Sequence, residues 1–252
     1  MVRARPCDQL QLLQVLDFFA GRDLGDTRLS LIFVATHPQV TPFYALGQRT
    51  PEQLEALFPA RGQVTDDQLQ LAHIAWQAFR SPNPTALETM LATDATALPF
   101  LRGALLRHLE EFPATEDGLS HTEREILERA VAGGRRPGPL FRAWMEREQA
   151  PFMGDAPFFA HVHALSQGAH PPLMVRDNAD GVFTLPGNWD DMAALQAQEH
   201  EVTPTGRAVL AGEARWIHLA GIDRWLGGVH LHGPAAQWRW SRQDGGLVPL
   251  AS

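Results

Sequence analysis

Residues 118–134 read GLSHTEREILERAVAGG, and this segment contains the start, the apolar face and the end of one amphipathic helix. Ser120 and Glu123 have the spacing of a capping box, in which each side chain accepts a hydrogen bond from a free N–H group at the helix start. Apolar residues then recur at helical spacing, and Gly133 and Gly134 end the pattern. The sequence therefore predicts a helix that begins at residue 121 and ends before Gly133.

Two more helices are predicted directly after the first, over about 139–149 and 155–167. The extended runs 172–176 and 181–185 follow, and the segment that joins them is rich in Asp, Asn and Gly, which predicts a β-hairpin. Three helices and a hairpin in this order are typical of a winged helix-turn-helix domain, which usually lays its third helix in the DNA major groove.

The beginning of the chain predicts a different architecture. Residues 8–20 (DQLQLLQVLDFFA) have the apolar spacing of an amphipathic helix. Residues 29–35 (LSLIFVA) form a nearly continuous apolar run, which is typical of a strand buried on both faces of a parallel sheet. No partner strand is predicted nearby, so we expect an orphan strand, the remnant of an α/β domain. Its unpaired edge predicts self-association.

The rest of the first part is predicted to be helical. Thr50 and Thr65 each precede a Gln by three residues, which is the pattern of a capped helix start. Shorter helices are expected over 85–91 and 98–112.

The architecture changes near residue 118, so we expect two parts. Residues 1–117 would be a mostly helical segment with one orphan strand, and residues 118–252 a winged-helix-like domain with a short β tail. The predicted strands of the tail are separated by Gly and Pro, and they lie over 229–232, 238–240 and 247–250. The predicted fold class is α+β, mainly helical.

The composition excludes several classes of chemistry. All 21 basic side chains among the 252 residues are arginine, and 29 residues are acidic, which gives a net charge of −8. Without lysine, the chain cannot form a Schiff base on lysine, anchor pyridoxal phosphate or supply the lysine of a phosphate-binding loop. The acidic balance also disfavours tight non-specific binding to nucleic acid.

The single cysteine, Cys7, excludes a disulfide scaffold and suits a reducing cytosol. With no histidine nearby in the sequence, it is a poor candidate nucleophile. No segment approaches the roughly 18 apolar residues of a membrane span. Residues 1–5 are basic, but Asp8 and several glutamines interrupt the apolar run that a signal peptide needs. We therefore expect a cytoplasmic protein.

Five strings of the sequence carry a resemblance to a known family: DQLQLLQVLDFF (8–19), LPFL (98–101), LRHLEEFP (106–113), GLSHTEREIL (118–127) and GIDRWLGGVHL (221–231). They resemble the C-terminal two thirds of a bacterial family whose members carry an N-terminal domain of unknown function, number 1835. The family has no established activity, so the resemblance implies no reaction. It does imply that typical members have an additional N-terminal α/β half, with a His-Asp pair at the end of a strand, which this chain lacks.

The candidate DNA-contacting side chains are arginines around the predicted winged helix: Arg135, Arg136, Arg142, Arg147 and Arg176. The third helix, which would read the bases, contains no arginine and only two histidines, His161 and His163. A base-reading surface is expected to be plainly basic. The sequence therefore favours contact with a protein over contact with DNA.

The segment 221–228 (GIDRWLGG) contains the candidate ligand-binding residues Asp223 and Arg224, which could pair or bind a polar ligand together with His230. The alternative, which the sequence favours, is a tight turn in which Trp225 and Leu226 dock the tail on the core, with glycines that allow a close backbone approach. His230 and His232 would share one strand face, but no third ligand has an obvious position, so no metal site is predicted.

No string matches a dinucleotide-binding, nucleophile-elbow or zinc-protease motif, and no catalytic residue or cofactor is predicted. The first hypothesis is a non-enzymatic cytoplasmic regulatory or adaptor module that uses a winged helix to contact protein or DNA. The alternative is an enzyme or ligand-binding protein whose active half is the N-terminal α/β domain that this chain lacks.

Overall fold

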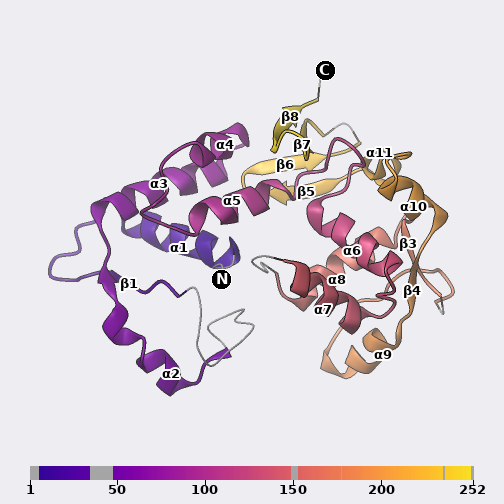
Figure 1. Ribbon diagram of the computed structural model, residues 1–252, viewed down its shortest axis with the longest axis horizontal. Coiled ribbons are helices and arrows are strands. Elements are labelled where there is room, and N and C mark those ends of the chain that lie inside the picture. Colours follow the sequence, from indigo (N-terminus) through magenta and orange to yellow (C-terminus); the bar gives the residue numbers. More distant parts are fainter. Residues whose placement is uncertain (1–5, 35–47, 149–152, 177, 235, 251–252) are drawn as a thin grey trace. The chain divides into compact units, whose positions relative to one another are not determined.

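The computed structural model describes residues 6–34, 48–148, 153–176, 178–234 and 236–250 (Figure 1). The fold is α+β, as the sequence predicts, and about 47% of it is helical. The described strands form four separate two-stranded sheets. The chain divides into two compact units: unit 1 holds the described residues up to His108 together with Gly227–Val229, and unit 2 holds the remainder.

Unit 1 is built on two helices that pack on each other, α1 (Pro6–Phe19) and α3 (Asp66–Arg80). Leu13 and Leu16 of α1 are buried, and so is Ala72 of α3, whose small side chain leaves room for the leucines. The other helices of this unit are α2 (Pro51–Glu55), η2 (Phe58–Ala60), α4 (Thr85–Leu91) and, up to His108, α5 (Leu101–Leu109).

All three predicted capping boxes are confirmed. In each, the N-cap hydroxyl accepts a hydrogen bond from a backbone N–H, and the side chain three residues later accepts one from the N-cap N–H. The pairs are Thr50 with Gln53, Thr65 with Gln68, and Ser120 with Glu123. These helix starts depend on neighbours in the sequence alone, which is why the pattern predicts them.

The predicted orphan strand over 29–35 is wrong. β1 (Ser30–Leu31) has only two residues and pairs antiparallel with β2 (Gly62–Gln63). None of the residues 29–34 is buried, and residue 35 lies outside the described part. An apolar run is buried on both faces only where neighbouring strands and helices cover it. Since β1 has a partner, self-association no longer follows from an orphan edge and stays a prediction.

The segment Gly227–Val229 belongs to unit 1 although it comes late in the chain. The N–H of Gly228 donates to the carbonyl of Phe79 (2.9 Å), and a Cβ on Gly228 would lie 2.0 Å from the carbonyl oxygen of Arg80. Only glycine permits so close an approach. Gly228 therefore allows the turn to pack closely on the backbone of α3. Of the two interpretations of the glycine pair, a ligand site or a tight turn, this contact supports the tight turn.

Unit 2 is centred on three helices, α6 (His121–Val131), α7 (Pro137–Arg147) and α8 (Asp155–Leu165), which pack on one another. Trp144 and Phe158 are fully buried where these helices meet, with ring centroids 5.2 Å apart. The elements that follow are β3 (Leu173–Val175), η3 (Trp189–Asp191), α9 (Met192–Ala197), β4 (His200–Val202), α10 (Pro204–Leu210) and α11 (Trp216–Ala220).

The predicted hairpin between 172–176 and 181–185 is also wrong. β3 pairs antiparallel with β4, and residues 181–185 form no strand. Phe183 is instead fully buried and contacts Phe159 of α8 (centroids 6.1 Å apart), so this segment packs on the helices. The turn-forming residues before this segment predicted that it would pair with β3, but β3 pairs with the more distant strand β4. The winged-helix assignment stays a prediction.

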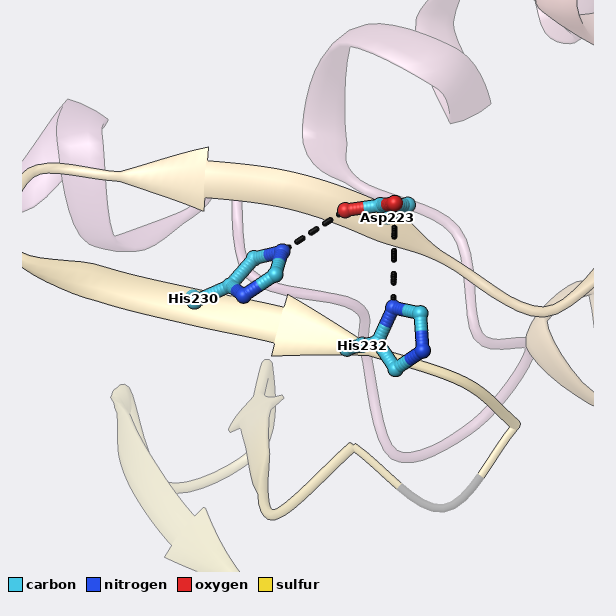
Figure 2. A group of neighbouring side chains, drawn as sticks. All are labelled: Asp223, His230 and His232. Carbon is cyan, nitrogen blue, oxygen red and sulfur yellow. Dashed lines mark hydrogen bonds and ion pairs between the residues drawn. The ribbon is translucent and has the colours of Figure 1, made fainter.

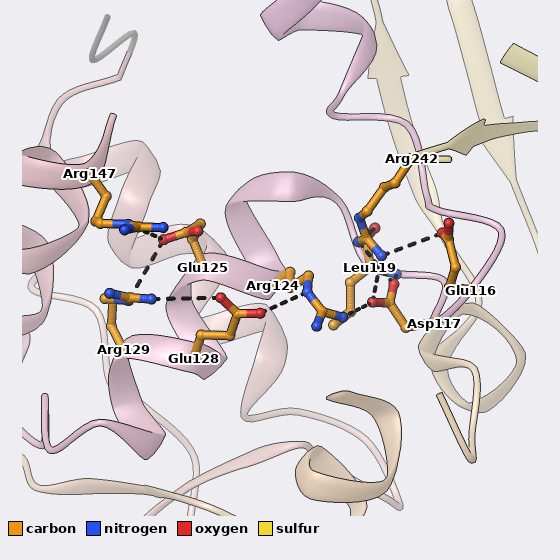
Figure 3. Close-up of polar contacts among 9 residues, drawn as sticks. All are labelled: Glu116, Asp117, Leu119, Arg124, Glu125, Glu128, Arg129, Arg147 and Arg242. Carbon is orange, nitrogen blue, oxygen red and sulfur yellow. Dashed lines mark hydrogen bonds and ion pairs between the residues drawn. The ribbon is translucent and has the colours of Figure 1, made fainter. Parts of the chain in front are cut away.

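The tail of the chain forms two pairs of strands: β5 (Asp223–Leu226) with β6 (Val229–His232), and β7 (Trp238–Ser241) with β8 (Gly246–Pro249). The carboxylate of Asp117, which is fully buried, accepts hydrogen bonds from Arg124 of α6 (2.5 Å) and from both ends of the Arg242 guanidinium (2.8 and 3.1 Å) (Figure 3). This carboxylate ties the tail to the start of α6.

Candidate functional site

The exposed face of the β5–β6 pair gathers Asp223, His230 and His232 (Figure 2). Burial alternates along both strands, as expected where one face of a strand pair is covered and the other is open to solvent. These three side chains and Trp225 lie on the open face, and they come from both strands. The predicted docking of Trp225 on the core is therefore wrong, because Trp225 is 65% exposed, whereas Leu226 is buried.

A two-residue turn brings the three side chains together. β5 ends at Leu226 and β6 begins at Val229, and the N–H of Gly233 donates to the carbonyl of Ile222 (2.7 Å). This pairing places Asp223 directly opposite His232. His230 lies two residues before His232 on the same face of the strand.

The distances within this group are short. His230 Nε2 lies 2.7 Å from Asp223 Oδ1, and His232 Nδ1 lies 3.7 Å from Asp223 Oδ2. One ligand atom from each residue falls within 4.8 Å of the others, and the described part of the chain holds no second group of this kind. The hydrogen bond from His230 lowers the pKa of Asp223, and the nearby imidazole of His232 contributes in the same direction.

An aromatic contact holds one ligand ring in place. The indole of Trp225 stacks on the imidazole of His230, with centroids 4.5 Å apart and an interplanar angle of 1°. Because the two residues lie opposite each other across the strand pair, the stack fixes the plane of the His230 ring without occupying its nitrogens.

Arg224, which the ligand-binding alternative grouped with Asp223, faces the other way. Neighbouring residues on a strand point to opposite faces, and the Arg224 guanidinium donates to the carboxylate of Glu123 at the start of α6 (2.5 Å). Glu123 also accepts from the N–H of Ser120 and lies 4.0 Å from His161. Of the three predicted ligand-binding residues, the structure therefore brings Asp223 and His230 together and separates Arg224.

Glu123 is a buried carboxylate that stays ionised. Burial acts to raise its pKa, but the charge of Arg224, the proximity of His161 and the hydrogen bond from Ser120 together hold the pKa of Glu123 below its ordinary value. Sequence reasoning missed this ion pair because its partners are 101 residues apart.

The five predicted DNA-contacting arginines all have exposed side chains in unit 2. Three of them face a carboxylate: Arg136 with Glu199 (3.0 Å), Arg147 with Glu125 (3.9 Å; Figure 3) and Arg176 with Glu201 (2.5 Å). Arg135 and Arg142 form no ion pair with any residue in the described ranges. The positive charge of this surface is thus largely balanced by its own acids.

The third helix, α8, turns its larger side chains inward. Phe158, Phe159, Val162 and Leu165 are buried, and His163 Nδ1 lies 2.5 Å from the carbonyl oxygen of Phe183. The exposed residues of this helix are small or acidic: Asp155, Ala156, Pro157, Ala160 and Ala164. None of them is a side chain that commonly reads base edges as a donor.

Unit 1 also contains a polar pair that was not predicted from the sequence. His73 Nδ1 lies 2.7 Å from Asp17 Oδ1, beside a shallow hollow at the adjoining ends of α1 and α3. The residues that line the hollow are Ala20, Gly21, Asp66, Leu69, Gln70 and His73. Since this lining offers no hydroxyl or thiol for the histidine to activate, we assign no chemistry to it.

Comparison of the chain with models of protein families, with curated proteins and with solved structures finds no match. The resemblance to the family with domain of unknown function 1835 therefore stays a prediction. Among the described residues, no helix combines the length and apolar character needed to cross a membrane.

Proposed function

We propose that this protein is a non-enzymatic cytoplasmic regulatory or adaptor module. In this proposal, α6, α7 and α8 with the β3–β4 pair form a winged-helix-like core that contacts another protein. The observation that carries the proposal is the outward face of α8, which presents alanines, a proline and an aspartate. Such a face allows another protein's side chains to approach the helix closely, and it offers DNA neither positive charge nor donors for the bases.

The charge distribution supports protein contact in the same way. Binding to DNA releases counterions in proportion to the phosphates that Lys and Arg neutralise. Here Arg136, Arg147 and Arg176 would first have to leave Glu199, Glu125 and Glu201, and these acids would then face the phosphates. Arg135 and Arg142 are the remaining exposed cations of the predicted set.

A photo-reactive amino acid in place of Ala160 tests the contact in the cells that make this protein. Ala160 is exposed on α8, and Ala193, exposed on α9 of the same unit, is the matched control. We expect one cross-linked protein from position 160 and not from position 193. Adding Ala164→Arg, about one turn further along the exposed face, should abolish the adduct. The same products from both positions, or none from position 160, would overturn the proposal.

Fluorescence anisotropy with random and genomic DNA duplexes at low salt tests the competing function. We expect binding weaker than about 1 mM, whereas non-specific DNA-binding proteins reach about 1–100 µM. Tighter binding that is weakened by Arg135→Ala together with Arg136→Ala would show instead that this surface contacts DNA.

A further inference from the structure

We propose that Asp223, His230 and His232 form a binding site for a divalent transition-metal ion, with Zn²⁺ as the expected physiological ion. The proposal is independent of the protein contact made by α6–α8, since it concerns different elements of the chain. It is carried by the convergence of three metal-ligating side chains from two strands on one exposed face.

The donor atoms select the class of ion. Two imidazole nitrogens and one carboxylate oxygen are suited to Zn²⁺, Co²⁺, Ni²⁺ and Cu²⁺. Mg²⁺ and Ca²⁺ prefer sites built from oxygen ligands alone. The site should therefore discriminate strongly against Mg²⁺ and Ca²⁺.

The present spacing is close to what such an ion requires. Ligand atoms about 2.0–2.2 Å from a tetrahedral Zn²⁺ lie roughly 3.3–3.6 Å from one another. Here His230 Nε2 lies 2.7 Å from Oδ1 of Asp223 and His232 Nδ1 lies 3.7 Å from Oδ2, and one ligand atom from each residue falls within 4.8 Å of the others. The His230–Asp223 distance must widen, and the widest separation of the three ligand atoms must close by at most about an ångström, which side-chain rotation can supply.

The surroundings permit that movement while they fix the backbone. The side chains of Asp223 and His232 are 70% and 72% exposed, so no packing has to be broken when they rotate. Leu226, Val229 and Leu231 are buried on the opposite face and anchor both strands. The stack with Trp225 already restricts the ring of His230. The entropy lost on binding is therefore confined to a few side-chain torsions.

The hydrogen bond between His230 and Asp223 is the arrangement that the ion has to displace. Metal binding requires neutral imidazoles with a free nitrogen lone pair, so the ion competes with protons as well as with this bond. Three protein ligands also leave at least one coordination position to water. These features describe an accessible site that exchanges its ion, as a sensing site requires, and differ from a closed structural zinc site.

Isothermal titration of the untagged full chain with ZnCl₂, and separately with MgCl₂, tests the proposal. We expect one Zn²⁺ per chain and no Mg²⁺ binding. Asp223→Asn, His230→Ala and His232→Ala should each weaken Zn²⁺ binding by about tenfold or more. His170→Ala and His218→Ala, which alter exposed histidines elsewhere in unit 2, are the matched controls and should leave it unchanged.

Absorption of the Co²⁺-loaded chain adds a readout of the ligands themselves. We expect visible ligand-field bands that are altered or lost in each of the three variants and retained in both controls. Circular dichroism checks that the variants fold, which their exposed positions predict. Failure of Zn²⁺ to bind, or binding and Co²⁺ bands that the three substitutions leave unchanged, would overturn the proposal and leave a hydrogen-bonded surface cluster only.

Discussion

Two neighbouring residues of β5 anchor two polar clusters with similar chemistry and opposite surroundings. Asp223 lies among His230 and His232 in solvent, whereas Arg224 reaches the buried carboxylate of Glu123, with His161 beside it. Each cluster combines a carboxylate with nitrogen donors, and the pKa of each carboxylate is lowered. The difference is burial, and burial decides whether a cluster can change its partners.

A buried charge that loses its partner has no water to replace it, so the Glu123 cluster is held in one arrangement. An exposed carboxylate is solvated whether or not it is paired. Asp223 can therefore give up its hydrogen bond with His230 and bind another ligand at little cost in free energy. The comparison therefore assigns structural support to the Glu123 cluster and ligand exchange to the Asp223 cluster.

The largest expected effect on stability comes from neutralising the two carboxylates in turn. Glu123→Gln removes the charge that balances Arg224, and we expect the free energy of unfolding of unit 2 to fall by about 3 kcal/mol. Asp223→Asn, the matched change on the exposed face, should leave it nearly unchanged, because an exposed carboxylate is solvated with or without its partners. Urea denaturation followed by circular dichroism measures both. Equal losses in the two variants would show that burial does not separate the clusters.

The second expected effect is stabilisation of the folded protein by the Zn²⁺ ion proposed for the exposed cluster. At a free Zn²⁺ concentration about a hundredfold above its dissociation constant, unit 2 should gain about 2.7 kcal/mol, because the ion binds the folded site and not the unfolded chain. In Asp223→Asn, whose site binds the ion about tenfold or more weakly, the gain should fall to about 1.4 kcal/mol or less. In Glu123→Gln the same gain as in the unaltered chain should be observed, although the free energy of unfolding without the ion is lower. Urea denaturation with and without the ion measures both quantities. An undiminished gain in Asp223→Asn would place the ion elsewhere.

The sequence predicted local features better than distant pairings, and β5 shows both outcomes. Gly227 and Gly228 stand between two short alternating runs, which is a hairpin pattern. A two-residue hairpin turn between these runs places Asp223 opposite His232. This register would have identified Asp223 as the third ligand beside the two histidines. The tight turn itself was predicted. The assignment of Arg224 to Asp223 overlooked that adjacent strand residues face opposite ways.

No local pattern could have revealed the partner of Arg224. Glu123 was recognised as a capping-box residue from its spacing to Ser120, but its ion pair depends on how the tail folds back onto α6. The same limit explains β3. Its true partner, β4, lies beyond a 3₁₀ helix and α9, whereas the turn signals at 177–181 favoured a neighbour. Helix starts are encoded by residues a turn apart, and strand partners are chosen by the completed core.

The smallest expected effect extends the comparison from carboxylates to histidines. His200 on β4 is buried, and its Nε2 lies 2.7 Å from the carbonyl oxygen of Gly134, while its Nδ1 is buried without a hydrogen-bond partner in the described structure. Burial lowers the pKa of His200 below the ordinary 6.5, although the Gly134 contact acts in the opposite direction. The folded state therefore favours the neutral ring.

A lowered histidine pKa means that the unfolded chain takes up the proton first, so this contribution to stability is complete above about pH 6.5 and is lost as the pH falls toward the folded-state pKa. Urea denaturation of unit 2 from about pH 7.5 to 5.5 should show this decline, and His200→Gln should remove it. His170→Gln, which alters an exposed histidine of the same unit, should leave the decline in place.

Glu123 does not contribute to this decline, because a carboxylate whose pKa is lowered below 4.5 stays ionised throughout this pH range. A decline that persists in His200→Gln would assign the titration to another histidine, and the distinction between buried and exposed clusters would then not hold for imidazoles.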